Sequence, residues 1–100
     1  MDKLAKSVGG IIFERAYCPA TVCCPSRSAL LSGIRPSTSG IYGNGNNMKL
    51  SPVIKDVDTI SQHFSNNGYH SLSAGKIFHK HPNWRGMDEG QWAFDEWARP

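Results

Sequence analysis

The feature of this sequence that most constrains its fold is an alternation of strand-like and helix-like segments. The run IIFERAY, residues 11–17, is rich in β-branched and aromatic residues, which predicts a strand. Pro25 suits the first turn of a helix and Gly33 suits its end, so a helix is predicted over about residues 25–32. Strands that alternate with helices favour an α/β architecture with a mainly parallel sheet and flanking helices.

The same alternation returns in the second half of the chain. Thr59 and Gln62 match the T-x-x-Q capping box, which predicts a helix start, and Asn67-Gly68 predicts the end of that helix. The run YHSLSAGK that follows, residues 69–76, predicts a second strand. A helix and a strand therefore follow one another twice along the chain.

Three other segments complete the outline. Asp2 can cap a short helix that runs through Lys6. Residues 34–52 consist largely of Gly, Asn, Ser and Pro, which predicts a long irregular loop. The tail has no clean period, and we expect its tryptophans to pack against other parts of a larger domain. They are Trp84, Trp92 and Trp97.

Charge and composition argue against several classes of partner. The 100 residues include 11 Lys and Arg against 8 Asp and Glu, a net charge of +3, and the charges are scattered. We therefore expect neither a nucleic acid nor a membrane as partner. No window approaches the roughly 18 consecutive apolar residues of a membrane span. Cys18, Cys23 and Cys24 form a poor disulfide framework, so they do not indicate a compartment.

The residues with reactive side chains follow the two predicted strands. Cys23 comes after the first strand, and Lys76 with His79 comes at the end of the second. Because the carboxyl ends of parallel strands share one edge of a sheet, we expect these groups to lie together. The helix start near Pro25 favours an anion, and Arg27 adds a forked donor that suits a tetrahedral oxyanion. The residues alone thus predict a site for a tetrahedral dianion with a cysteine-derived nucleophile.

A family resemblance makes this prediction more specific. Cys23-Cys24-Pro25-Ser26-Arg27, followed by SALLSG, resembles the type I sulfatase signature C-x-P-S-R-x-x-x-L-x-G. Gly75-Lys76 with His79 matches a second element of that family. The spacing GKIFH and the loop IRPSTSGIY are most similar to the iduronate-2-sulfatase-like branch. The similarity runs from residue 1 to about residue 81, and it implies an alkaline-phosphatase-like α/β fold.

The resemblance also implies a mechanism. Cys23 would be oxidised to Cα-formylglycine by a formylglycine-generating enzyme that reads Pro25 and Arg27 before the chain folds. One hydroxyl of the aldehyde hydrate, held on a bound calcium ion at residue 23, would attack the sulfur of a sulfate ester. Arg27 would steady the hydrate, Lys76 would bind a sulfate oxygen, and His79 would accept the proton of the second hydroxyl. The implied substrate class is sulfated carbohydrate.

The same resemblance predicts that residues 1–100 are an N-terminal part of a sulfatase catalytic domain. The paired aspartates and the other metal ligands of the family are expected before residue 1 and after residue 100. A hard cation such as calcium needs about six to eight oxygen ligands, which this segment does not supply. We therefore expect the piece alone to be inactive, and the family implies a periplasmic, secreted or lysosomal location for the whole protein.

Two hypotheses from other classes stay open at this stage. A small zinc module could use Cys18, Cys23 or Cys24 with His79 and His81, although the spacing fits no common zinc pattern. A non-catalytic module that binds sulfated glycans is the other possibility. Cys24 is expected to be a packed residue beside the reactive one, as free cysteines usually are.

Overall fold

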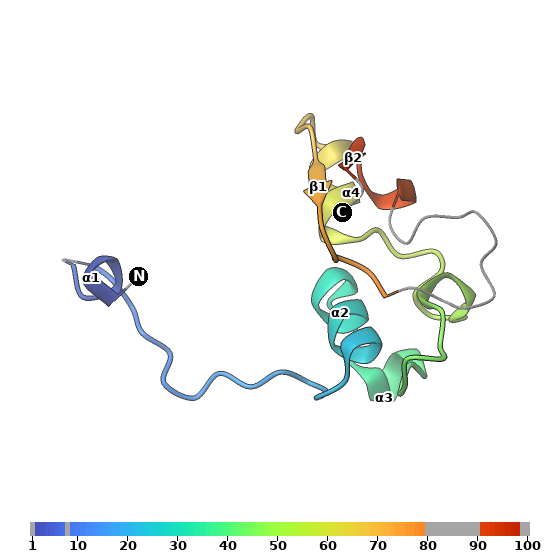
Figure 1. Ribbon diagram of the computed structural model, residues 1–100, viewed down its shortest axis with the longest axis horizontal. Coiled ribbons are helices and arrows are strands. Elements are labelled where there is room, and N and C mark those ends of the chain that lie inside the picture. Colours follow the sequence, from blue (N-terminus) through green and yellow to red (C-terminus); the bar gives the residue numbers. More distant parts are fainter. Residues whose placement is uncertain (1, 8, 80–90, 99–100) are drawn as a thin grey trace.

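The computed structural model describes residues 2–7, 9–79 and 91–98. The described segments from α2 onward form one body, whereas α1 and residues 9–20 extend away from that body (Figure 1). In chain order the elements are α1 (Asp2–Ala5), α2 (Cys23–Ser32), α3 (Pro36–Ser39), η1 (Met48–Leu50), α4 (Ile60–Asn66), β1 (Leu72–Ala74), η2 (Gln91–Ala93) and β2 (Glu96–Ala98), where η marks a 3-10 helix.

The helix α2 confirms the prediction made from Pro25 and Gly33, although it begins two residues earlier, at Cys23. Gly33 ends the helix with a φ of 73°, in the left-handed region that glycine enters without strain. Its N–H donates to the carbonyl of Ala29 at 2.9 Å. At the start of the helix, the cap residue Val22 offers no side-chain acceptor.

The helix α4 is also confirmed, with both arms of its capping box. The Thr59 hydroxyl accepts from the N–H of Gln62, and the Gln62 side chain accepts from the N–H of Thr59 at 2.9 Å. Thr59 is fully buried, so the cap is shielded from water. The apolar residues of this helix, Ile60 and Phe64, remain exposed over 55% and 46% of their surface.

The described residues contain one sheet, made of two parallel strands. β1 pairs with β2 so that Leu72 lies opposite Glu96 and Ala74 lies opposite Ala98. β1 falls inside the predicted strand 69–76 and is shorter than predicted. The parallel pairing agrees with the α/β prediction in part, but β2 was not predicted, because the tail shows no alternation of apolar and polar residues.

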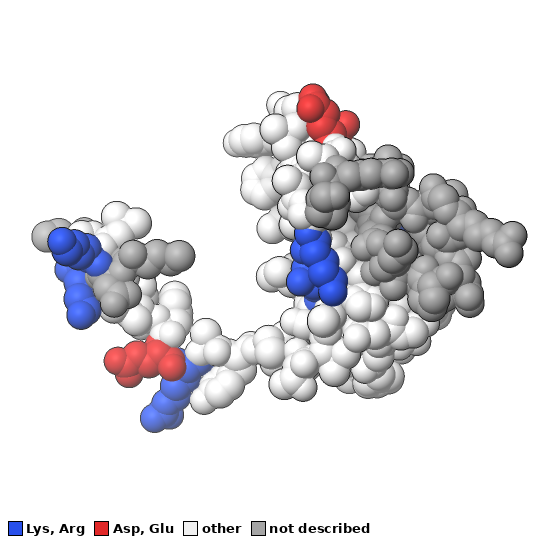
Figure 2. Space-filling view, viewed as in Figure 1, with Lys and Arg blue, Asp and Glu red and all other residues white. Residues whose placement is uncertain are grey.

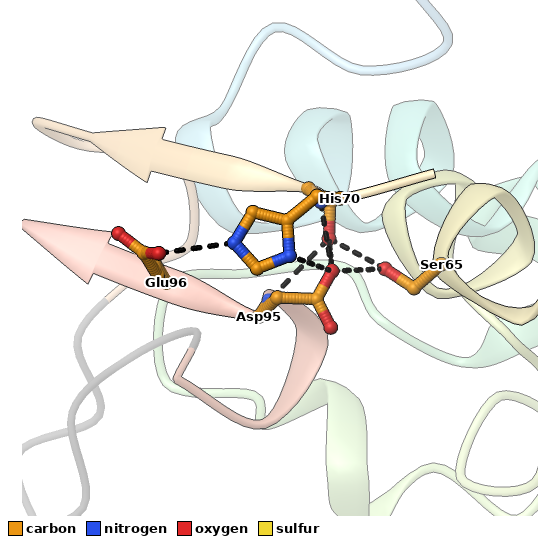
Figure 3. A network of polar contacts seen from close by, with 5 residues as sticks. Ser65, His70, Asp95 and Glu96 are labelled. Atoms are coloured by element: carbon orange, nitrogen blue, oxygen red, sulfur yellow. Dashed lines mark hydrogen bonds and ion pairs between the residues drawn. The ribbon is translucent and has the colours of Figure 1, made fainter. Parts of the chain in front are cut away.

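A polar network holds the two strands in register (Figure 3). Oδ2 of Asp95, just before β2, accepts from the N–H of Ser71 and from the hydroxyl of Ser65 in α4, both at 2.7 Å. His70 Nε2 lies 3.0 Å from Glu96 Oε1. Hydrogen bonds from the Ser71 backbone and from the Ser65 hydroxyl lower the pKa of Asp95 to about 2. The carboxylate of Asp95 therefore ties α4, the start of β1 and the start of β2 together.

The predicted strand at residues 11–17 is wrong. These residues form no strand, and Ile11, Phe13 and Tyr17 are exposed over 75%, 79% and 85% of their surface. They lie in the extended arm that leaves the body (Figure 1). A strand is stabilised by hydrogen bonds to a neighbouring strand, and no described segment runs beside this one.

The predicted irregular loop at residues 34–52 is wrong in part. It contains the short helices α3 and η1, and its residues Ile41 and Met48 are buried in the core. The chain is thus anchored at several points between α2 and residue 52. Gly, Asn and Ser in this segment favour turns, and the turns bring its few apolar residues back onto α2.

The core joins α2, this folded segment and the chain that follows β1. Its buried members are Cys24, Leu31, Ile41, Met48, Ile54, Phe78 and Ala93. Phe78 packs against Trp92 with ring centroids 5.1 Å apart, and the Lys49 ammonium lies 3.8 Å from the centroid of the Trp92 ring. Trp92 therefore packs within this chain, and Trp84 lies outside the described residues.

Candidate active site

Cys23 is the first residue of α2 and is exposed, whereas its neighbour Cys24 is buried with 4% of its surface accessible. Burial raises the pKa of the Cys24 thiol, which also donates to the carbonyl of Asn46 at 3.3 Å. The prediction that Cys24 is a packed residue is confirmed. Of the adjacent pair, only Cys23 presents its sulfur to solvent and to reagents.

Arg27 brings the two sequence motifs together. It lies one helical turn after Cys23, so the two side chains leave the same face of α2. Its Nη1 donates to the carbonyl of Lys76 at 2.6 Å and to the carbonyl of Ile77 at 2.9 Å. The guanidinium therefore connects the helix of the C-x-P-S-R motif to the segment that leaves β1.

The arrangement leaves positive charge beside Cys23. Among the described residues, Nε and Nη2 of Arg27 make no hydrogen bond, so these donors remain available to an anion. Lys76 is exposed, and no described residue forms an ion pair with it. Figure 2 shows basic side chains on this side of the body, where α2 lies beside the chain that leaves β1. Such a face suits a tetrahedral anion with several oxygens.

His79 follows β1 by five residues and is half-buried. Its Nδ1 is enclosed and has no hydrogen-bond partner within the part of the chain that the structure describes. Buried ring nitrogens of histidine usually have a hydrogen-bond partner, so an unpaired one is uncommon. Lys76 and His79 follow a strand as predicted, but Cys23 does not, because residues 11–17 form none.

An open pocket of about 450 Å³ lies beside the start of α2. The exposed Cys18 forms part of its wall, and the Cys18 thiol donates to the carbonyl of Ala20 at 3.1 Å. The sequence did not single out Cys18 as a residue of this pocket. The pocket is lined by Cys18, Ala20, Thr21, Val22, Cys23, Ser26, Arg27 and Leu30.

Sequence reasoning also missed Asn44. Its side-chain oxygen accepts a hydrogen bond of 3.0 Å from the backbone N–H of Cys24, 20 positions earlier in the chain. The one available signal was the apolar cap residue Val22, which leaves the first N–H groups of α2 without a local acceptor. No sequence pattern indicates which distant residue supplies the missing acceptor.

Two features of the described residues bear on the predicted metal site and on insertion into a membrane. No group of three or more His, Cys, Asp or Glu side chains there is placed to hold a metal ion. His81, which the zinc hypothesis needs, lies outside the described residues. In the same ranges, no helix is both long enough and apolar enough to cross a bilayer.

Comparisons with known proteins agree with the motif reading. The sulfatase family model matches residues 1–99. A sulfatase of Formosa agariphila is 43% identical over 93 residues, covering 89% of this chain and 18% of that protein. Human iduronate 2-sulfatase is 35% identical over 79 residues, covering 79% and 14% respectively, and an ulvan-active sulfatase of F. agariphila is 32% identical over 83 residues, covering 83% and 15%.

The chain therefore spans less than a fifth of the length of these relatives. No solved structure matches it significantly. The match of the family model over nearly the whole chain, together with the two motifs that Arg27 joins, leads to one assignment: the chain belongs to the sulfatase family.

Proposed function

We propose that the whole protein hydrolyses sulfate esters to an alcohol and inorganic sulfate, and that residues 1–100 form the N-terminal part of its catalytic domain. The observation that carries this proposal is the contact of Arg27 with the carbonyls of Lys76 and Ile77. This contact joins the segments that carry the two family motifs, and Cys23 is exposed one turn before Arg27 on the same helix, which supports a shared site.

The nucleophile in this proposal derives from Cys23, which a formylglycine-generating enzyme converts to Cα-formylglycine. As a hydrate, this group supplies one hydroxyl for attack on sulfur and a second whose deprotonation releases sulfate. The position of Cys23 supports the assignment, because its side chain is exposed at the start of a helix, where the helix dipole is positive. Cys24 does not suit this role, since its thiol is buried and donates a hydrogen bond to the carbonyl of Asn46.

Three side chains have separate roles in the proposed site. The Nε and Nη2 groups of Arg27 orient the hydrate and offset the negative charge near it, while Nη1 keeps its backbone contacts. The Lys76 ammonium binds a non-bridging oxygen of the sulfate group. Because Nδ1 of His79 is enclosed, we assign Nε2 as the nitrogen that accepts the proton of the second hydroxyl.

Calcium belongs to the proposal only as a cofactor of the whole protein. The described residues contain no group of three or more His, Cys, Asp or Glu side chains placed to hold a metal ion, so they do not by themselves supply the carboxylates that calcium favours. A calcium site takes about six to eight oxygen ligands. We propose that the oxygen of modified residue 23 would be one of them and that the others would come from parts of the whole protein that the structure does not describe. The roles given to Arg27, Lys76 and His79 do not depend on it.

The proposed substrates are sulfated carbohydrates. Two of the relatives are named for iduronate and for ulvan, which are a sugar acid and a polysaccharide. An open pocket beside Cys23, with Arg27 in its lining, suits a sulfate group that projects from a larger polar molecule. Within the described ranges, no observation favours the zinc-module or glycan-binding hypotheses over hydrolysis.

The test uses the longer protein that contains this segment, made together with a formylglycine-generating enzyme. The wild type should carry an aldehyde at residue 23 and release sulfate from p-nitrophenyl sulfate and from a 2-O-sulfated uronic acid disaccharide. Cys23→Ser should be sulfated once and then stop, because a serine ester has no second hydroxyl to expel sulfate. The matched control Cys24→Ala should keep both the aldehyde and the activity. Full turnover by Cys23→Ser would exclude the proposal.

A further inference from the structure

The start of α2 depends on a residue that lies far away in the sequence. A helix leaves its first four N–H groups without partners in the helix, and a polar residue at the cap position usually serves one of them. Val22 occupies that position here and offers no side-chain acceptor. The N–H of Cys24 instead donates to Oδ1 of Asn44 at 3.0 Å. Asn44 therefore caps α2 from a different segment of the chain.

The loop that holds Asn44 is itself fixed by hydrogen bonds. Oδ1 of Asn46 accepts from the N–H of Tyr42 at 3.0 Å and from the N–H of Gly43 at 2.9 Å. The carbonyl of Asn46 accepts from the thiol of Cys24 at 3.3 Å. Two bonds thus run from this loop to Cys24, one to its backbone and one to its sulfur.

Both ends of the loop are buried. Ile41 precedes it with 2% of its surface accessible, and Met48 follows it with 6%, and both pack in the core cluster with Cys24. Asn44 itself is exposed. The asparagine is therefore presented from a rigid support, and its replacement removes a hydrogen bond without opening a cavity.

We propose that Asn44 is a positioning residue for the sulfatase reaction: through the backbone of Cys24 it sets the direction in which residue 23 presents its oxygen to the sulfate ester. The inference rests on the proposed function, because it concerns the nucleophile assigned there. Cys23 is the first residue of α2, where an uncapped helix frays first. Nucleophiles need placement to within about 0.5 Å, and an error of about 1 Å can cost roughly a hundredfold in rate.

Three variants of the whole sulfatase test this proposal. Asn44→Ala removes the cap, and Asn44→Asp keeps an acceptor oxygen at the same place. Asn66→Ala is the matched control. Asn66 lies in α4, and its side chain makes one exposed hydrogen bond of 2.8 Å, to Asp58. The measurements are kcat and KM for p-nitrophenyl sulfate, the aldehyde content of residue 23 by mass, and hydrogen exchange of the peptide that covers residues 22–30.

For Asn44→Ala we expect kcat to fall about tenfold and exchange at the start of α2 to rise about tenfold, as the loss of one hydrogen bond predicts. Aldehyde content and KM should stay near the wild-type values. Asn44→Asp should restore kcat and slow exchange, with a higher KM because its negative charge lies near the sulfate site. Asn66→Ala should match the wild type in all three measurements.

The contrary results are distinct. Wild-type kcat and unchanged hydrogen exchange in Asn44→Ala would overturn the positioning role. The role would also be overturned if Asn44→Ala and Asn44→Asp lost kcat equally while Asn44→Asp alone showed wild-type exchange. A wild type that carries the aldehyde and releases no sulfate would overturn the proposed function instead. Faster exchange in Asn44→Ala would then still establish the cap as a structural contact.

Discussion

Replacing Arg27 with alanine is the most informative perturbation of the site, because this residue makes the contact that joins the two motifs. The substitution removes two hydrogen bonds from a charged donor, at 2.6 Å to Lys76 and at 2.9 Å to Ile77. Each bond of this kind contributes about 1.5–3 kcal/mol when shielded from water. One of the two is exposed, so we expect Arg27→Ala to lower the free energy of unfolding by about 2 kcal/mol.

The effect on catalysis should be larger than the effect on stability. Without Arg27 the chain that leaves β1 loses these two hydrogen bonds to α2, and the donors Nε and Nη2 disappear from the proposed sulfate site. We expect kcat/KM per aldehyde-containing molecule to fall by at least about a hundredfold, as for the loss of one strong oxyanion donor. Arg27→Lys should recover little, since an ammonium cannot hold two carbonyls and still offer a planar fork.

The assay is sulfate release by the longer protein, divided by its aldehyde content, together with urea unfolding monitored by tryptophan fluorescence. Division by aldehyde content is essential, because the modifying enzyme is expected to read Arg27 as well. Arg35→Ala is the control, since Arg35 is an exposed arginine in the same body. Arg27→Ala with wild-type stability and wild-type activity per aldehyde would refute the role given to this residue.

Four further predictions concern the parts of the fold that support the site. Gly33→Ala should destabilise the protein by about 1 kcal/mol in urea unfolding, because alanine is strained at a φ of 73° even though its Cβ would meet no atom; an unchanged midpoint would contradict this. Thr59→Ala should cost about 1 kcal/mol or more by the same measurement, because it removes a buried cap, whereas Thr59→Ser should cost less. The Glu96 partner raises the pKa of His70, so this pair should stabilise the fold fully below pH 6.5 and lose its effect as pH rises through the raised value. Asp95 has a lowered pKa of about 2, so its contribution to the free energy of unfolding should be present above pH 3.8 and disappear as pH falls toward 2. Both assignments are checked by urea unfolding across pH. If His70→Gln and Asp95→Asn keep the wild-type pH dependence, the assignments are contradicted.

The elements that could be predicted from sequence are those whose signals are local. Gly33 marks the end of α2 and the Thr59–Gln62 pair marks the start of α4, and both helices form where these residues place them. Each signal acts within four residues, so no knowledge of the tertiary fold is needed. The predicted start of α2 lies two residues after the observed one, because the residue that accepts a hydrogen bond from the first turn, Asn44, is not local in the sequence.

The errors concern contacts between distant segments. Residues 11–17 have the composition of a strand, but pairing depends on a neighbour that composition does not specify. β2 forms without an alternating pattern, because Asp95 bonds to Ser71 and aligns the tail with β1. In the same way, motif spacing predicted Cys23, Arg27, Lys76 and His79 as site residues, while the bond from Arg27 to the Lys76 carbonyl became visible only in the structure.

The relation between the chemical state of residue 23 and turnover tests the account most directly. The longer protein is prepared with graded amounts of the modifying enzyme, and each preparation is assayed for sulfate release and for the fraction of residue 23 that carries an aldehyde in place of the thiol. The account predicts that sulfate release is proportional to the aldehyde fraction and reaches zero with it. Equal turnover in a preparation whose residue 23 is entirely thiol would contradict it.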